Sequence, residues 1–182
     1  MEKVTILHKH FKKFISSQTI QEKVSRIAER INRDFEGKEV VFVGILNGVF
    51  IFVADLFRQV NLKARITFLR LASYHGMEST GKVKQLIGLS EDLKNHIVIV
   101  VEDIVDTGTT LDHIIRQLQS FQPAEIHVVT LLLKPEAYHH RIPIDYVGME
   151  IPNKYIIGYG LDYNGYGRNL DGIYVLDENN ES

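Results

Sequence analysis

The stretch EDIVDTGTT, residues 102–110, brings acidic side chains and hydroxyl groups close together. Glu102, Asp103 and Asp106 precede or adjoin a loop made of Thr107, Gly108, Thr109 and Thr110. Backbone amides of a Gly/Thr loop at a helix N-terminus bind anions, and hydroxyls add donors for a phosphate. Neighbouring carboxylates suit ribose hydroxyls and Mg²⁺, which prefers oxygen ligands. The stretch therefore predicts a site for a sugar phosphate that carries a metal-bound second group.

The same residues allow other interpretations. Asp106 or Thr107 alone would make an ordinary helix cap, with the acids favoured by the helix dipole. An Asp-Thr-Gly triplet also occurs in aspartic proteases, but those proteins continue as strands, whereas this chain continues as an amphipathic helix. No GxxxxGK[ST] motif is present, and the pair Gly158 and Gly160 does not complete GxGxxG.

The flanking residues predict how this stretch is positioned. The run IVIVV (97–101) has no polar alternation, which indicates a central strand covered on both faces. Apolar residues at helical spacing then predict a helix that ends near Pro123: Leu111, Ile114, Ile115 and Leu118. The acids thus follow the carboxyl end of a strand, where open α/β sheets bind their ligands.

Strands and helices alternate through the middle of the chain. The pattern predicts helices over 19–35 and from Gly48 through Phe57, and strands over 40–45, 64–74 and 126–133. Residues 75–84 are polar and show no clear period. This order predicts an α/β fold with a twisted parallel sheet flanked by helices.

The final third differs from the middle, because short apolar segments are punctuated by glycine with no helix between them. We expect a small β-rich hood or edge over about 145–176, together with the N-terminal segment. The core is expected over about 20–135, and the whole chain, 1–182, is expected to form a single domain.

Composition restricts the kind of partner. Of the 182 residues, 45% are hydrophobic and 24% charged, and 21 basic against 23 acidic side chains give a net charge of -2. This balance offers no general basic surface for nucleic acid or an anionic membrane. The absence of cysteine excludes disulfides and thiolate chemistry. The charged N-terminus MEKVTILHKHFKKF lacks a signal-peptide pattern, and a cytoplasmic protein is expected.

Several segments together resemble one protein family. VVEDIVDTGTTL (100–111) resembles the phosphoribosyl-pyrophosphate (PRPP) motif of type I phosphoribosyltransferases. The segments VGILNGVFIF (43–52), LASYHGMESTGKVK (71–84), LLLKP (131–135) and EIPNKYIIGYGLDYNGYGRNL (150–170) are similar to hypoxanthine-guanine phosphoribosyltransferases. The resemblance runs from about residue 40 to 176 in the right order and implies the type I phosphoribosyltransferase fold.

The resemblance implies roles for the residues of the opening stretch. Glu102 and Asp103 match acids that hold the ribose hydroxyls of PRPP, directly or through Mg²⁺. Asp106 matches the residue near purine N7 that handles a proton during the exchange. The cradle for the 5′-phosphate is matched by Thr107, Gly108, Thr109 and Thr110.

Other matched residues surround the purine and the pyrophosphate. Lys134 matches the ammonium that donates to O6 of a 6-oxopurine, although by itself a lysine at a strand end is usually solvated. Tyr155 and Ile104 match residues on the two faces of the purine, and Ile156 matches main-chain groups near its 2-position. Asp162 matches a metal ligand beside the purine, and Arg168 matches a guanidinium that reaches the pyrophosphate.

The pyrophosphate loop departs from the family pattern. Leu46, Asn47 and Gly48 match residues of a tight loop whose amides contact pyrophosphate, but many members have Lys-Gly-Gly where this chain has Asn47, Gly48 and Val49. A side-chain contact from position 47 is therefore in doubt, while main-chain contacts can persist because Gly48 remains. Residues 73–84 match a mobile loop that closes over the site, with Ser73 and Tyr74 near its start.

The resemblance implies an enzyme of purine salvage. It would transfer the phosphoribosyl group of PRPP to N9 of hypoxanthine or guanine, with Mg²⁺, and would form a homodimer or homotetramer. Two alternatives stay open: a transferase that prefers xanthine, and a PRPP-binding regulator without turnover. A regulator would usually carry an added nucleic-acid surface, which this near-neutral chain lacks.

Overall fold

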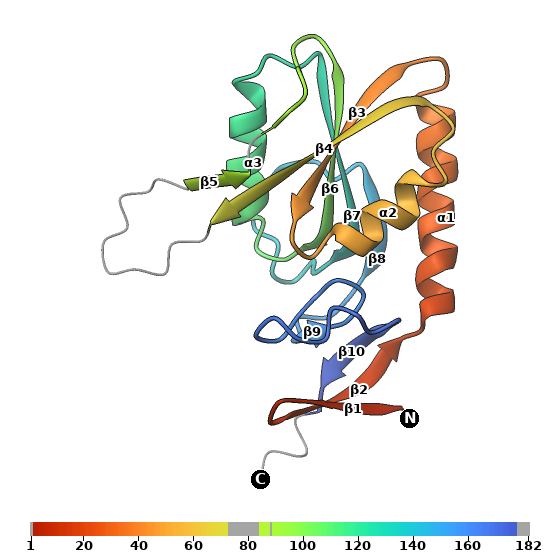
Figure 1. Ribbon diagram of the computed structural model, residues 1–182, viewed down its shortest axis with the longest axis vertical. Helices are drawn as coiled ribbons and strands as arrows, with labels where there is room; N and C mark the ends of the chain where they lie inside the picture. Colours follow the sequence, from red (N-terminus) through yellow and green to blue (C-terminus); the bar gives the residue numbers. More distant parts are fainter. Residues whose placement is uncertain (1, 73–83, 88, 178–182) are drawn as a thin grey trace.

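The computed structural model describes residues 2–72, 84–87 and 89–177, and its main sheet has six strands. Their order is β5 (Lys84–Ile87), β4 (Lys63–Ala72), β3 (Glu39–Leu46), β6 (Ile97–Val105), β7 (Glu125–Leu133) and β8 (Tyr146–Glu150). Neighbours from β4 to β8 pair in parallel, and β5 pairs antiparallel with β4. The predicted parallel α/β sheet is therefore confirmed (Figure 1).

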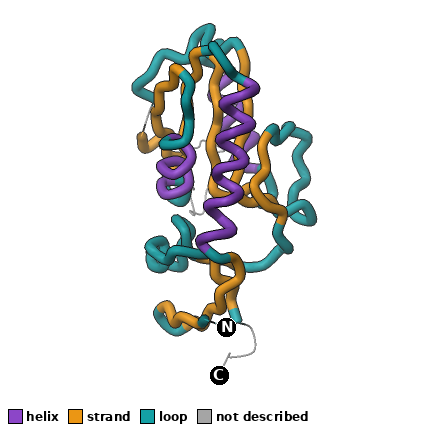
Figure 2. The backbone as a smooth tube through the Cα atoms, turned by 90° about the vertical axis from the view of Figure 1, so that its right-hand side faces the viewer, coloured by secondary structure: helices purple, strands orange, loops and turns teal. Residues whose placement is uncertain are grey.

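Helices cover both faces of the main sheet. Helices α1 (Ser17–Asp34) and α2 (Phe50–Phe57) pack on one face, and α3 (Thr109–Gln119) packs on the other (Figures 1 and 2). Strand β6 shows why its sequence is apolar without alternation: Ile99 and Val101 face α1 and α2, whereas Val98 and Val100 face α3. A strand buried on both faces is apolar along its covered part. In β6 the first polar side chains, Glu102 and Asp103, come near its carboxyl end.

The helix boundaries lie near the expected ones. Ser16 caps α1, and its hydroxyl accepts a 3.2 Å hydrogen bond from the backbone N–H of Thr19. The second helix begins at Phe50, two residues after Gly48, and the third ends at Gln119, before Pro123. Among the described residues, none of the helices is long and apolar enough to cross a membrane.

A second, four-stranded sheet is built from both ends of the chain. Its order is β1 (Lys3–Ile6), β2 (Lys9–Ile15), β10 (Ile173–Leu176) and β9 (Ile156–Ile157). This sheet and the loop 158–170 are called the hood below; it lies on the side of the main sheet toward which β3 and β4 run (Figure 1). The C-terminal strands expected to form one hood or edge thus divide, because β8 extends the main sheet beside β7.

Candidate active site

The predicted residues gather where three adjacent strands of the main sheet end. Residues 46–49, 102–110 and 134 lie at or just after the carboxyl ends of β3, β6 and β7, respectively. A cavity of about 220 Å³ lies at the end of β6, and it is lined by Glu102, Ile104, Val105, Asp106, Thr107, Gly108, Thr110 and Leu111. Ligands of open α/β sheets bind at this edge.

The loop before α3 has the geometry of an anion site. Gly108 is the N-cap of α3 in a left-handed conformation, with φ of 89°, and it has no side chain to cap the helix. The Thr107 hydroxyl accepts a 3.4 Å hydrogen bond from the backbone N–H of Thr109. The threonines of the loop are exposed, and the Thr107 hydroxyl donates to that of Thr109 at 3.2 Å. The first amides of α3, the threonine hydroxyls and the positive end of the helix dipole therefore lie together at the start of the helix. The interpretation of Asp106 as a simple helix cap is wrong, because Gly108 occupies the cap position.

Tyr138 and His140 cover the back of this loop, and the sequence patterns did not single them out. A Cβ atom at Gly108 would stand 2.5 Å from the Tyr138 ring and 3.1 Å from the His140 ring. The backbone N–H of His139 donates to the Thr107 carbonyl at 3.3 Å. The segment after β7 therefore fixes the loop from behind, which explains why position 108 has no room for a side chain.

Glu102 and Asp103 are acids placed in poor contact with water. Only 7% of Glu102 is exposed, and burial, with Asp103 beside it, raises its pKa well above the usual value. Burial also raises the pKa of Asp103 to about 6, although the Ile104 amide donates to its carboxylate at 2.8 Å. Desolvated carboxylates of this kind gain most from a bound cation or hydroxyl donors.

Asp162 does not join Glu102 and Asp103 in a ready-made metal cage. Its carboxylate pairs with Arg168 at 2.7 Å and accepts the Gly165 amide at 2.6 Å. No group of three or more His, Asp or Glu side chains that could hold a metal occurs within the described residues. The donor set fits a magnesium ion held by one or two carboxylates together with substrate oxygens, which is how Mg²⁺ is commonly bound.

Asp106 and Lys134 form an ion pair. The Lys134 ammonium donates to Oδ2 of Asp106 at 2.8 Å, and the lysine is only 7% exposed. Lys134 directly follows β7, which lies beside β6, so the sheet brings the two residues together from different loops. A cationic donor and a carboxylate side by side can recognise a group that offers an acceptor next to a donor.

The residues matched to the purine faces lie in different layers. Ile104 is half-buried in the main sheet, Ile156 is buried in the hood, and Tyr155 is 49% exposed. The Tyr155 hydroxyl donates to the Asp162 carbonyl at 3.0 Å, which holds the ring against the loop that follows. An exposed aromatic face supported in this way can stack on a flat ligand.

The loop after β3 is built around Gly48. A Cβ atom there would collide with the Asp103 carboxylate, and one at Gly160 of the hood would collide with the Gly48 carbonyl. The Leu46–Asn47 peptide is cis, and Asn47 is exposed. Arg168 lies nearby in the hood loop, where it donates to the Gly160 carbonyl at 2.7 Å. The loop is thus enclosed by β6 on one side and the hood on the other.

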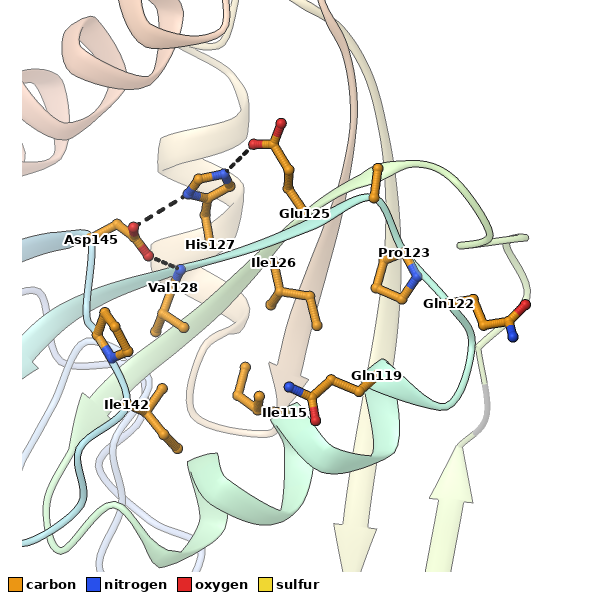
Figure 3. Close-up of a pocket in the computed structure, with 12 residues that line it drawn as sticks. Ile115, Gln119, Gln122, Pro123, Glu125, Ile126, His127, Val128, Ile142 and Asp145 are labelled. Atoms are coloured by element: carbon orange, nitrogen blue, oxygen red, sulfur yellow. Dashed lines mark hydrogen bonds and ion pairs between the residues drawn. The ribbon is translucent and has the colours of Figure 1, made fainter.

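A larger cavity, of about 440 Å³, lies elsewhere and is a poorer candidate. It is formed by the end of α3, the start of β7 and residues 142–145 (Figure 3). On its wall, His127 bonds Glu125 through Nε2 at 2.8 Å and Asp145 through Nδ1 at 3.3 Å. These carboxylates lie on opposite sides of one ring, so they do not converge on a common point.

Two predicted residues cannot be placed in this arrangement. Ser73 and Tyr74, at the start of the expected closing loop, lie outside the described residues. Every other predicted residue is described, and most lie at the ends of β3, β6 and β7 or in the facing hood.

Comparison with known families gives one match over most of the chain. Residues 14–164 match the phosphoribosyl transferase domain family. A hypoxanthine-guanine phosphoribosyltransferase from Staphylococcus aureus is 39% identical over 163 residues, which cover 89% of this chain and 91% of that protein. One from Mycobacterium bovis is 36% identical over 170 residues, which cover 90% of this chain and 84% of that protein.

Solved structures agree with the sequence comparison. A hypoxanthine-guanine phosphoribosyltransferase from Bacillus anthracis superposes with a TM-score of 0.85 at 39% identity, covering 91% of this chain and 96% of that one. A hypoxanthine phosphoribosyltransferase from Staphylococcus aureus gives a TM-score of 0.87 at 37% identity, covering 94% of each chain.

Proposed function

The chain belongs to the phosphoribosyl transferase family, and we propose that it transfers the 5-phosphoribosyl group of PRPP to N9 of hypoxanthine or guanine. The products are IMP or GMP and pyrophosphate, which makes the reaction a step of purine salvage. The observation that carries the proposal is the Lys134–Asp106 ion pair beside the anion loop that opens α3. It supplies a recognition group for a 6-oxopurine next to a site for a sugar phosphate.

In this proposal the β6–α3 loop binds the ribose phosphate. Amides and hydroxyls of residues 107–110 hold the 5′-phosphate, and the helix dipole favours its charge. Glu102 and Asp103 accept hydrogen bonds from the ribose hydroxyls, which restore the solvation that burial removes from their carboxylates. Their negative charge also lies where the ribose carbon becomes cationic as pyrophosphate departs, and it stabilises that state.

Asp103 and Glu102 are the residues that would hold Mg²⁺, with Asp162 as the third candidate. Bound there, the ion would offset the charge of the departing pyrophosphate. Asp162 is committed to Arg168 in the described arrangement, so the buried pair on β6 carries the proposal. Arg168 is then held close to the pyrophosphate loop by its bond to the Gly160 carbonyl.

In this proposal the purine is bound by Lys134, Asp106, Ile104 and residues of the hood. The Lys134 ammonium donates to O6, and Asp106 faces N7, where it can hold or transfer a proton. Ile104 and Tyr155 enclose the two faces of the ring, and backbone groups of Ile156 lie toward the 2-position. Each of these assignments is supported by the matched motif and by the position of the residue, either at the carboxyl end of the main sheet or in the hood.

The test is a panel assay with PRPP, Mg²⁺ and hypoxanthine, guanine, xanthine or adenine, in which nucleotide products are separated by chromatography. We expect IMP and GMP, and no product once the divalent cation is chelated. Micromolar binding of PRPP without conversion of any base would identify a regulator instead. Faster turnover of xanthine than of hypoxanthine or guanine would reassign the substrate.

The assembly and location of the protein belong to the same proposal. We expect a homodimer or homotetramer in the cytoplasm, as the family resemblance implies. Light scattering of the purified protein measures the oligomeric state, and a single monomeric mass at micromolar concentration would contradict the expectation.

A further inference from the structure

A partly buried hydrogen bond joins the hood to helix α2. The Tyr159 hydroxyl donates to Oδ2 of Asp55 at 2.6 Å, and Tyr159 is only 4% exposed. Gln21 of α1 donates to the same carboxylate oxygen at 2.7 Å. Asp55 is therefore bonded from two elements at once, and it ties the hood loop to the two helices on one face of the main sheet.

Tyr159 stands next to the residue that contacts the pyrophosphate loop. Its backbone has a φ of 49°, and its N–H donates to the Leu170 carbonyl at 2.9 Å. The next residue, Gly160, lies so close to Gly48 that a Cβ there would collide with the Gly48 carbonyl. The residue that bonds Asp55 is therefore the direct chain neighbour of the residue whose backbone packs on Gly48.

The contacts close into a ring. Gly48 leads through Val49, the N-cap of α2, into the helix that carries Asp55. Asp55 bonds Tyr159, and Gly160 returns to Gly48. On the other side of Gly48 stands the Asp103 carboxylate, so the loop is packed from both sides. The position of the loop is thus set by the helix that follows it and by the hood together.

We propose that Asp55 and Tyr159 are positioning residues that fix the main-chain amides of residues 47–49 for pyrophosphate, a role that rests on the proposed transferase function. Position 47 is an exposed asparagine, which brings no cation to the site. Without a charged side chain, the loop can offer pyrophosphate only neutral donors, chiefly its backbone amides, and such hydrogen bonds weaken steeply when distance or angle is wrong. The position of the backbone therefore matters more in this loop than in a loop that also has a charged side chain.

A purely structural role for the bond is the competing explanation, and the chain offers a matched control. Tyr146 of β8 is also 4% exposed, and its hydroxyl donates to Asp34 of α1 at 2.9 Å. Tyr146→Phe removes the same type of phenol–carboxylate bond from a helix packed on the same face, but far along the chain from Gly48. Tyr159→Phe and Tyr146→Phe should lower thermal stability by similar amounts.

The experiment compares wild type, Tyr159→Phe, Asp55→Asn and Tyr146→Phe by calorimetric titration with magnesium pyrophosphate and, separately, with IMP. We expect Tyr159→Phe to weaken pyrophosphate binding about tenfold, as the loss of a hydrogen bond to a charged group allows. IMP binding should change by less than about twofold. The KM for PRPP should rise while kcat at saturating PRPP stays within about twofold. Tyr146→Phe should leave both ligands unchanged.

Three outcomes would overturn the inference. Unchanged pyrophosphate binding in Tyr159→Phe would show that the bond does not position the loop. Equal losses for pyrophosphate and IMP, or an equal loss in Tyr146→Phe, would show a general structural effect. A wild-type protein that binds neither ligand would contradict the proposed transferase function itself, and that result is separate because it needs no variant.

Discussion

The ammonium of Lys134 and the carboxylate of Asp106 are bonded to each other at 2.8 Å in the protein without substrate. Lys134 comes from the end of β7 and Asp106 from the loop after β6, and both line the same edge of the main sheet. In the proposed reaction, these two groups address adjacent positions of the purine, O6 and N7. The base must therefore enter a pre-formed pair, and each partner keeps the other in place until it does.

The first prediction concerns proton handling by Asp106. Asp106→Asn keeps an oxygen that can accept from Lys134, so the pair should persist, but the amide cannot take up or release the proton. We expect kcat to fall by roughly 10²-fold or more while PRPP affinity stays within a few-fold. Steady-state kinetics and PRPP titration measure the two quantities. An unchanged kcat would leave Asp106 with only a structural role.

The second prediction concerns base selection by Lys134. An ammonium has donors only, so it bonds O6 of hypoxanthine but meets another donor at the N6 amine of adenine. We expect adenine to be worse than hypoxanthine by at least roughly 10³-fold in kcat/KM. Lys134→Gln should reduce the ratio of kcat/KM for hypoxanthine to kcat/KM for adenine, chiefly by lowering the value for hypoxanthine.

The matched control for this prediction is Lys94→Gln, which removes an exposed ammonium far from the site. It should leave kcat/KM unchanged for hypoxanthine, guanine and adenine. An equal fall for all three bases in Lys134→Gln would mean that the lysine supports the loop or PRPP and does not select the base.

The third prediction concerns pH and Asp103. Burial raises the pKa of Asp103 to about 6 in the folded protein, above its ordinary value of 3.8. A group with a raised folded pKa adds stability at low pH, and that stability is lost as the pH rises through about 6. The charged carboxylate therefore destabilises the metal-free protein at pH 8, by about 3 kcal/mol. Asp103→Asn should remove this penalty.

Thermal unfolding with a chelator present measures the effect. Asp103→Asn should have a higher Tm than wild type at about pH 8, and the difference should shrink toward about pH 4, where the wild-type acid is protonated. A variant that is less stable than wild type at both pH values would show that the carboxylate is not strained by burial.

The fourth prediction uses two glycines to separate two effects of an added side chain: collision with neighbouring atoms and an unfavourable backbone conformation. Gly160 and Gly165 have φ of 103° and 85°, so alanine is strained at both. Only at Gly160 would the added methyl collide with another backbone, that of Gly48, whereas nothing lies within 4 Å at Gly165. We expect Gly165→Ala to cost about 1 kcal/mol of stability and little activity. Gly160→Ala should raise the KM for PRPP at least tenfold or prevent folding.

Gly165→Ala is the control for Gly160→Ala, because both variants place alanine at a positive φ but only Gly160→Ala also causes a collision. Unfolding curves and PRPP kinetics for the two proteins give the comparison. Equal, small effects at the two positions would mean that the hood does not press on the pyrophosphate loop.

The sequence predicted the central strand and the anion loop because both have local signals. A strand covered on both faces is apolar at every position, as in 97–101, and the Gly and Thr residues that follow mark the loop before the next helix. The same locality explains the prediction of α1, whose buried residues recur at helical spacing. These features needed no knowledge of what packs against them.

A β-rich hood was expected, but its strand pairing and its contacts with the rest of the protein could not be found in this way. Strand β2, KHFKKFI, carries lysines between its apolar residues, so its pairing with β10 leaves little mark on the sequence. Asp55 and Tyr159 are 104 positions apart, and each looks ordinary in its own segment. Tyr138 and His140 were missed for the same reason, because their role depends on where Gly108 lies in space.

The pairing of β2 with β10 joins strands from the first and the last parts of the described chain. During synthesis on the ribosome, β2 emerges early and has no partner strand on that side until β10 is released. The main sheet, whose strands follow one another more closely along the chain, can assemble before then, since local contacts form faster than distant ones. The hood therefore closes last, and a nascent chain that stalls before β10 would display an unpaired, lysine-bearing edge at β2.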